Sequence, residues 1–143
     1  MIDVIVSRRD QRGYAVSVIM LGVVAALILV AGLVIDGGQK ATAASRAETV
    51  AAGAARAAVN AGVTGTLAGD ADPSLSSRQA RAAAQDYLAA ADGTGRLRGW
   101  VDISGDRVIV RTEVTVDTIF LSIITIDQLH AHGEATARLV ATR

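Results

Sequence analysis

The sequence predicts an α+β protein with a long N-terminal helix that crosses a membrane, a second short helix and a small antiparallel sheet of about three strands. Three observations lead to this prediction. An uncharged apolar run occupies residues 14–35, alanine-rich helical patterns follow it, and apolar and polar residues alternate from Arg96 onward. We therefore expect a cytoplasmic tail (1–13), a transmembrane helix (14–35), an alanine-rich continuation of that helix (36–61) and a small extracytoplasmic α+β head (62–143).

The apolar run from Tyr14 to Ile35 has the length and composition of a membrane span. A helix over these 22 residues is about 33 Å long, and the hydrocarbon core of a bilayer is roughly 30 Å thick. A core helix of a soluble protein would show polar residues at a period of about 3.6, whereas only Ser17 interrupts this run. Tyr14 is typical of an interfacial anchor. Asp36 is expected to mark the membrane boundary or to contact another subunit.

The charges around the span predict its orientation. Arg8, Arg9 and Arg12 precede the span, and only Lys40 and Arg46 follow it closely. This difference favours an N-terminus in the cytoplasm and a head outside the cytoplasmic membrane. A cleaved signal peptide is an alternative, because "ATAA" at residues 41–44 could be cut after Ala43. However, the apolar part of a signal peptide usually spans about 7–15 residues, which is shorter than this run.

Alanine-rich sequence carries the first helix beyond the membrane. The composition favours helix to about Asn60, with Gly62 as a C-terminal cap, while Gly37 and Gly38 permit a bend at the membrane surface. This half buries little area per residue, so it needs a partner, either the chain's own head or a neighbouring copy. Its apolar face comprises Ala44, Ala47, Ala51, Ala54, Ala55 and Ala58.

A loop and a second helix are expected next. Residues 62–76 are rich in glycine, aspartate and serine, which predicts a loop. Ser76 or Ser77 can cap a helix that continues to Asp92. Its apolar stripe follows helical spacing and comprises Ala80, Ala83, Ala84, Tyr87, Leu88 and Ala91.

A β-hairpin is predicted around a two-residue turn at Gly105–Asp106. In that register Val101 faces Val110 and Ile103 faces Val108 on the buried side. The opposite side pairs Arg98 with Glu113 and Trp100 with Arg111, which predicts an ion pair and a cation–aromatic pair.

A last strand is predicted over residues 128–140, with one small, apolar face suited to a helix lying close against it. Before this strand, "DTIFLSIITID" holds many large apolar residues, including Phe120 and Ile123. It either forms a short helix or strand that completes the core, or it forms a surface patch that touches lipid headgroups or a partner subunit.

We find no pattern that predicts an enzyme. The chain has no cysteine, which excludes thiolate chemistry, and it lacks the common phosphate-binding, nucleophile-elbow and zinc-protease motifs. His130, His132 and Glu134 share a strand face and could form a metal triad, but no fourth ligand is evident, so we expect no metal and no other cofactor. The zero net charge does not point to nucleic acid. Trp100 is the strongest candidate for a binding hot spot.

The two ends of the chain resemble a known family. "RRDQRGYAVSVIMLGVVAALILVAGLVIDGGQKATAASRAETVAAGAARA" resembles the N-terminal region of TadE/TadG-like proteins, which belong to bacterial tight-adherence (Tad, Flp-type) pilus systems. The shared pattern is an Arg–Gly before a single apolar helix, an aspartate that closes it and an alanine-rich helix with scattered arginines. "IFLSIITIDQLHAHGEATARLV" is similar to the C-terminal end of actinobacterial members.

This resemblance implies a non-enzymatic minor pilin or pseudopilin with a pilin-like fold, held in the cytoplasmic membrane. Its partners would be other Tad-type pilins or assembly proteins, or further copies of itself, and extraction into a pilus is an option. Prepilin peptidase would cut after Gly13, before Tyr14, although Val18 stands where processed pilins carry glutamate; the TadG-like branch also lacks that glutamate. The alternative function is a membrane-tethered binding module that uses the exposed sheet face.

The residues expected to carry these functions form two sets. The membrane and assembly helix would use Tyr14, Gly22, Ala26, Gly32, Asp36, Ala47, Ala51, Ala54 and Ala58. Contacts to a partner would come from Trp100, Arg111, Phe120 and Ile123.

Overall fold

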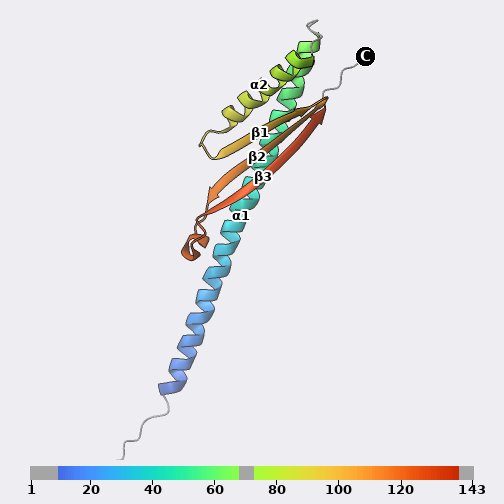
Figure 1. The fold of residues 1–143 in the computed structure, drawn as a ribbon. Coiled ribbons are helices and arrows are strands. Elements are labelled where there is room, and N and C mark those ends of the chain that lie inside the picture. Colours follow the sequence, from blue (N-terminus) through green and yellow to red (C-terminus); the bar gives the residue numbers. More distant parts are fainter. Residues whose placement is uncertain (1–9, 68–72, 139–143) are drawn as a thin grey trace, which may run out of the picture.

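The computed structural model describes residues 10–67 and 73–138 of the chain and confirms the predicted α+β class. A long helix and a short helix accompany an antiparallel sheet with the strand order β1-β2-β3. Figure 1 shows α1 as a rod, with α2 and the sheet gathered along its second half. The elements are α1 (Asp10–Leu67), α2 (Pro73–Ala91), β1 (Leu97–Ser104), β2 (Arg107–Asp117), the 3-10 helix η1 (Leu121–Ile124) and β3 (Gln128–Arg138).

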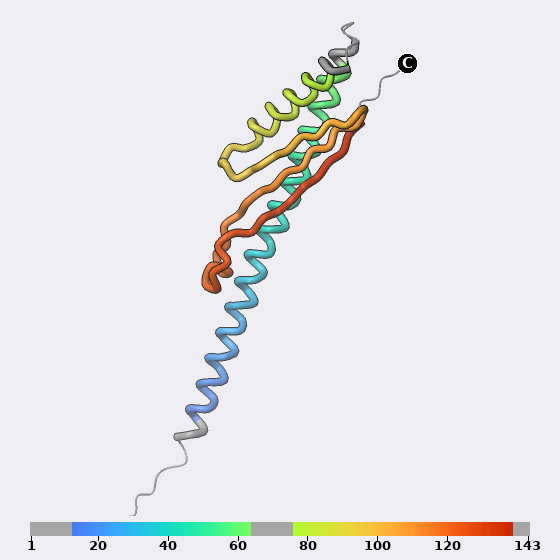
Figure 2. The backbone as a smooth tube through the Cα atoms, in the orientation of Figure 1, coloured from blue at the N-terminus to red at the C-terminus, as the bar shows by residue number. Residues whose placement is uncertain are grey.

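Helix α1 is continuous and longer than predicted. It runs through Gly37 and Gly38 without interruption, and Figure 2 shows a nearly straight course. The predicted cap at Gly62 is wrong, because α1 ends at Leu67. Gly62 is buried, and its carbonyl accepts a hydrogen bond from the Ser76 hydroxyl at 2.9 Å. Packing against α2 therefore carries α1 past a residue that would end an isolated helix.

The predicted loop over residues 62–76 is too long. Helix α2 already begins at Pro73, whose restricted φ suits the first helical turn. Ser76 therefore lies inside α2 and bonds α1, which rules out its predicted role as the cap. Residues 68–72, the middle of the expected loop, lie outside the described residues.

The alanine face of α1 packs against the chain's own head. The small side chains let α2 and the sheet approach the helix closely, so the head has a core built largely of alanine and valine. Of the two predicted partners, the chain's own head packs on this face. The buried residues of this core are Ala43, Ala47, Val50, Ala51, Ala54, Ala55, Ala58, Ala80, Ala84, Leu88, Leu97, Val108, Val110, Val114 and Ala131.

The predicted hairpin register is confirmed. Val101 pairs with Val110, and Trp100 pairs with Arg111, around the turn at residues 105–106. Strand β2 is central, because β3 pairs with its other edge. The last strand is confirmed from Gln128 to Arg138, and its predicted residues 139–140 lie outside the described part of the chain.

Strand β3 rests directly on the backbone of α1 at Gly133. A Cβ atom added there would lie 2.4 Å from the carbonyl carbon of Ala47 and 2.4 Å from the amide nitrogen of Glu48. Beside this contact, the buried Thr112 hydroxyl donates to the Ala47 carbonyl at 2.8 Å. The small inner face of β3 therefore brings sheet and helix into backbone contact, as its composition predicted.

Helix α2 bridges α1 and β1 through two more glycines. The ring of Tyr87 lies over Gly53 of α1, where an added Cβ would come within 2.4 Å of its Cζ atom. Leu88 fills the space over Gly99 of β1 in the same way. These contacts complete the head around the second half of α1.

Candidate functional site

The first half of α1 is bare. Residues 13–31 are all exposed, including Leu21 at 71 % and Leu27 at 64 %. Within the described residues, α1 is one helix that is long and apolar enough to cross a membrane, and almost none of its most apolar segment is buried in the protein. This segment is therefore not a core helix of the head, and its composition and exposure fit a lipid environment.

Gly32 and Asp36 form the junction between the bare half of α1 and the head. The Asp36 side chain is only 1 % exposed. Its carboxylate accepts three backbone N–H hydrogen bonds, from Ile119 at 2.9 Å, Phe120 at 3.0 Å and Leu121 at 2.8 Å. One turn earlier, the Phe120 ring covers Gly32, where an added Cβ would lie 2.4 Å from its Cγ atom. Gly32 and Asp36 thus hold the start of η1 against α1.

The sequence did not predict the hydrogen bonds that Asp36 makes with its own chain. The carboxylate neither faces water at the membrane boundary nor is left free for another subunit, because three N–H groups of its own chain surround it. An ionised carboxylate is an acceptor only, and hydrogen bonds to a charged acceptor are about twice as strong as neutral ones. The sequence offered one hint, a glycine four residues before the aspartate, but the partner loop lies more than 80 residues away.

The segment around η1 is a surface element and does not complete the core. It is a short helix, one of the predicted forms, but none of the four η1 residues is buried. Four isoleucines are exposed by between 42 % and 74 % and form a surface that we call the apolar foot: Ile119, Ile123, Ile124 and Ile126. Figure 1 shows the coil between β2 and β3 at the end of the head nearest the bare half of α1.

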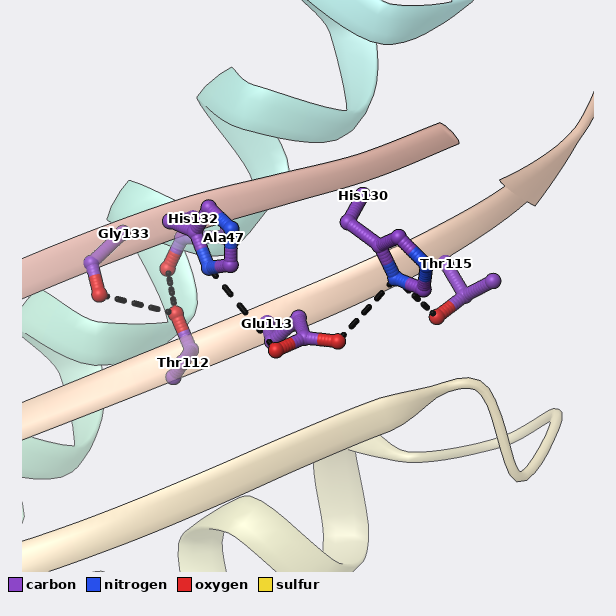
Figure 3. A network of polar contacts seen from close by, with 7 residues as sticks. All are labelled: Ala47, Thr112, Glu113, Thr115, His130, His132 and Gly133. Carbon is purple, nitrogen blue, oxygen red and sulfur yellow. Dashed lines mark hydrogen bonds and ion pairs between the residues drawn. The ribbon is translucent and has the colours of Figure 1, made fainter. Parts of the chain in front are cut away.

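The outer face of the sheet carries a second polar cluster. Glu113 on β2 lies between two histidines of β3, with carboxylate oxygens 3.0 Å from Nδ1 of His130 and 3.8 Å from Nδ1 of His132 (Figure 3). The predicted ion pair between Arg98 and Glu113 is therefore wrong, although the two residues are backbone partners. Because β2 is the central strand, Glu113 can turn to β3, a pairing that the hairpin alone does not indicate.

Arg111 also finds its partner on β3. Its Nε donates a hydrogen bond to a carboxylate oxygen of Glu134 at 2.8 Å. This hydrogen bond and the negative charge of Glu134 raise the pKa of the guanidinium above its ordinary value. Arg111 is the backbone partner of Trp100 as predicted, but the interaction that the structure shows for its guanidinium is with Glu134. Trp100 is 53 % exposed and lines an open hollow together with Arg111, His132 and Glu134.

The three residues considered as a metal triad do not converge. His130 and His132 face Glu113, while Glu134 faces Arg111. Within residues 10–67 and 73–138, no group of three or more histidine, aspartate or glutamate side chains could hold a metal ion.

The predicted site residues thus separate into distinct places. Gly13, Tyr14, Val18, Gly22 and Ala26 lie exposed on the bare half of α1. Phe120 is half-buried over Gly32, and Ile123 is the most exposed residue of the apolar foot. The four alanines at 47, 51, 54 and 58 are fully buried in the head, so they offer no surface to another subunit.

Comparison with known proteins finds no matching family model, no matching curated protein and no matching solved structure.

Proposed function

We propose that this chain is a non-enzymatic, membrane-anchored minor pilin or pseudopilin that acts in the assembly or at the tip of a Tad-type pilus. One observation carries the proposal. A single continuous helix has a bare apolar first half and a second half that forms the spine of the head. Such a helix links the membrane segment rigidly to the head, as a subunit that is packed through its N-terminal helix requires. The resemblance to TadE/TadG-like proteins supports the same function.

The bare half is the apolar part of α1 that is exposed on every side. In the second half, α2 and the sheet cover one face, and the exposed face carries mainly polar residues such as Lys40, Arg46 and Glu48, so apolar contacts through α1 would come from residues 13–31. Gly22 and Ala26 lie one turn apart on this half, and small residues at that spacing let membrane helices approach closely. We place the N-terminus in the cytoplasm and the head outside the cytoplasmic membrane. The partners would be other Tad-type pilins, assembly proteins or further copies of this chain.

Cross-linking in intact cells tests this proposal. The chain has no cysteine, so Gly22→Cys or Ala26→Cys introduces a single reactive site on the bare half. We expect capture of another pilin-type subunit from these positions. The matched control is Ser104→Cys, which is exposed at the hairpin end of the head. Absence of any captured subunit from positions 22 and 26, or the same products from position 104, would contradict the proposal.

The intact mass of the native protein tests processing. A cut after Gly13, a cut after Ala43 and an uncut chain give different masses. Release after Ala43 would remove Gly32 and Asp36, which seat η1. We therefore expect α1 to stay joined to the head, and a mature chain that starts at residue 44 would contradict this.

A membrane-tethered binding module is the second candidate, favoured by the open hollow beside the half-exposed Trp100. In that case the span acts only as a tether. Replacing residues 14–31 by an unrelated single-pass helix separates the two functions. The pilin proposal predicts loss of pilus assembly, whereas the tether predicts that function is retained.

A further inference from the structure

We propose that the apolar foot lies in the bilayer that α1 crosses, at the boundary between headgroups and acyl chains, and gives the head a second contact with that membrane. The inference rests on the membrane anchoring in the proposed function. Its ligand is the acyl-chain surface of a phospholipid leaflet. Four observations carry it: the level of η1 along α1, the continuity of the apolar surface, the inward direction of the loop's polar groups and the burial of Asp36.

The level of η1 along α1 matches the edge of a bilayer. The loop meets the helix at Gly32, in the last turn of the apolar run, and at Asp36, the residue directly after that run. From Tyr14 to Ala31 the bare helix is about 27 Å long, close to a hydrocarbon core of roughly 30 Å. A bilayer centred on this segment would have its outer boundary at the height of η1. Interfacial elements bury their apolar side chains about 5–10 Å into this boundary.

The apolar foot continues the exposed apolar surface of α1. Leu33, Val34 and Ile35 are exposed by 45 % to 69 % on the helix, and Ile123 is exposed by 74 % on the loop beside it. Both surfaces lie at the same end of the head (Figure 1). A protein partner that covered the foot would have to occupy the lipid layer next to α1, whereas lipid covers both surfaces at once.

The backbone donors of the loop are turned inward. The N–H groups of Thr118, Ile123, Thr125 and Ile126 donate to carbonyls of the same loop at 3.0–3.2 Å. The N–H groups of residues 119–121 donate to the Asp36 carboxylate. Hydrocarbon offers no hydrogen-bond partners, so a loop that touches lipid must satisfy its polar groups internally.

The loop's hydroxyl groups and the buried Asp36 of α1 follow the same rule. The Ser122 hydroxyl donates to the Ile119 carbonyl at 2.8 Å, and the Thr125 hydroxyl donates to the Ile124 carbonyl at 2.6 Å. Asp36 would be costly next to lipid if its carboxylate were unpaired, but it is 1 % exposed and surrounded by N–H donors. The loop thus presents isoleucine outward, while its Ser122 and Thr125 hydroxyls bond within the protein and the exposed Asp127 side chain can face the headgroups. Two membrane contacts, α1 and the foot, would restrain the tilt of α1 and of the head relative to the membrane plane.

Fluorescence of the full-length protein in phosphatidylcholine–phosphatidylglycerol vesicles tests the inference. Ile123→Cys, labelled with an environment-sensitive fluorophore, is read out with lipids that carry a spin label near the top of the acyl chain. We expect a blue-shifted emission and quenching several-fold stronger than for Ser104→Cys, the exposed control on the far end of the head. Gly22→Cys, in the middle of the bare half, is read out with lipids that carry the spin label near the end of the acyl chain, and it reports whether the helix itself is inserted.

The outcomes separate the foot from the anchor. If position 123 is as weakly quenched as position 104 while position 22 is quenched, the lipid contact of the apolar foot is refuted and the membrane anchoring by α1 is retained. If position 22 is also unquenched, the membrane anchoring of the proposed function fails together with the inference. Quenching at position 123 that changes strongly with the lipid-to-protein ratio would assign the foot to a neighbouring subunit and overturn the lipid contact. Quenching that is independent of this ratio supports it.

Discussion

Gly133→Ala should be among the most damaging small substitutions in the head. The new Cβ would lie 2.4 Å from the Ala47 carbonyl carbon and from the Glu48 nitrogen, and 2.6 Å from the Ala47 oxygen. Non-bonded carbon atoms prefer separations of about 3.5–4.0 Å, so sheet and helix must separate by about 1 Å. The clashing atoms belong to the backbone of α1, so no side chain can rotate away to relieve the overlap.

The expected cost follows from two effects. Overpacking a close contact typically costs about 1–3 kcal/mol. The same separation weakens the buried hydrogen bond from Thr112 to Ala47, now 2.8 Å, and such a bond contributes about 1 kcal/mol. We therefore expect the free energy of unfolding to fall by about 2–4 kcal/mol. For a domain of this size, each kcal/mol lowers the melting temperature by about 4–8 °C.

Thermal unfolding of the full-length protein in detergent micelles measures this effect. The single tryptophan, Trp100 on β1, reports on the sheet without interference from the bare half of α1. Gly93→Ala is the matched control, because no atom lies within 4 Å of the new Cβ, and it should change the stability by less than about 0.5 kcal/mol. If Gly133→Ala has the same melting temperature as the Gly93→Ala control, the conclusion that β3 rests on the helix backbone is refuted.

Three further predictions concern single contacts. Thr112→Val keeps the shape of the side chain but removes its bond to α1, so it should cost about 1 kcal/mol in the same thermal assay, while Thr112→Ser should cost less. Arg111→Ala should change stability by less than about 1 kcal/mol, because its pair with Glu134 is exposed and screened by water; a larger loss would show that the pair is structural. Asp36→Ala should speed amide hydrogen exchange at residues 119–121 several-fold, and Asp36→Asn, which keeps one acceptor oxygen, should do so less; unchanged exchange in Asp36→Ala would show that the carboxylate does not hold the loop.

The elements that the sequence predicted well depend on local patterns. The apolar run over residues 14–35 and the alternation in β1, β2 and β3 are visible without tertiary knowledge, because each reflects a repeat within one element. The hairpin register followed from the two-residue turn at residues 105–106, since such a turn determines which residues face each other. The alanine face of α1 was also visible, but its partner was left open between the head and another copy.

The contacts that only the tertiary structure decided join distant parts of the chain. Asp36 and the η1 loop are separated by more than 80 residues, and no periodicity relates them. Glu113 contacts the histidines of β3 because β2 is the central strand. The extension of α1 to Leu67 depends on its packing against α2. The sequence alone determines the apolar run, the two helices and the hairpin register, because these features arise from residues that are close together in the chain. The seating of its loop on α1 and the exposure of the apolar foot arise from side chains that meet only when the chain is folded.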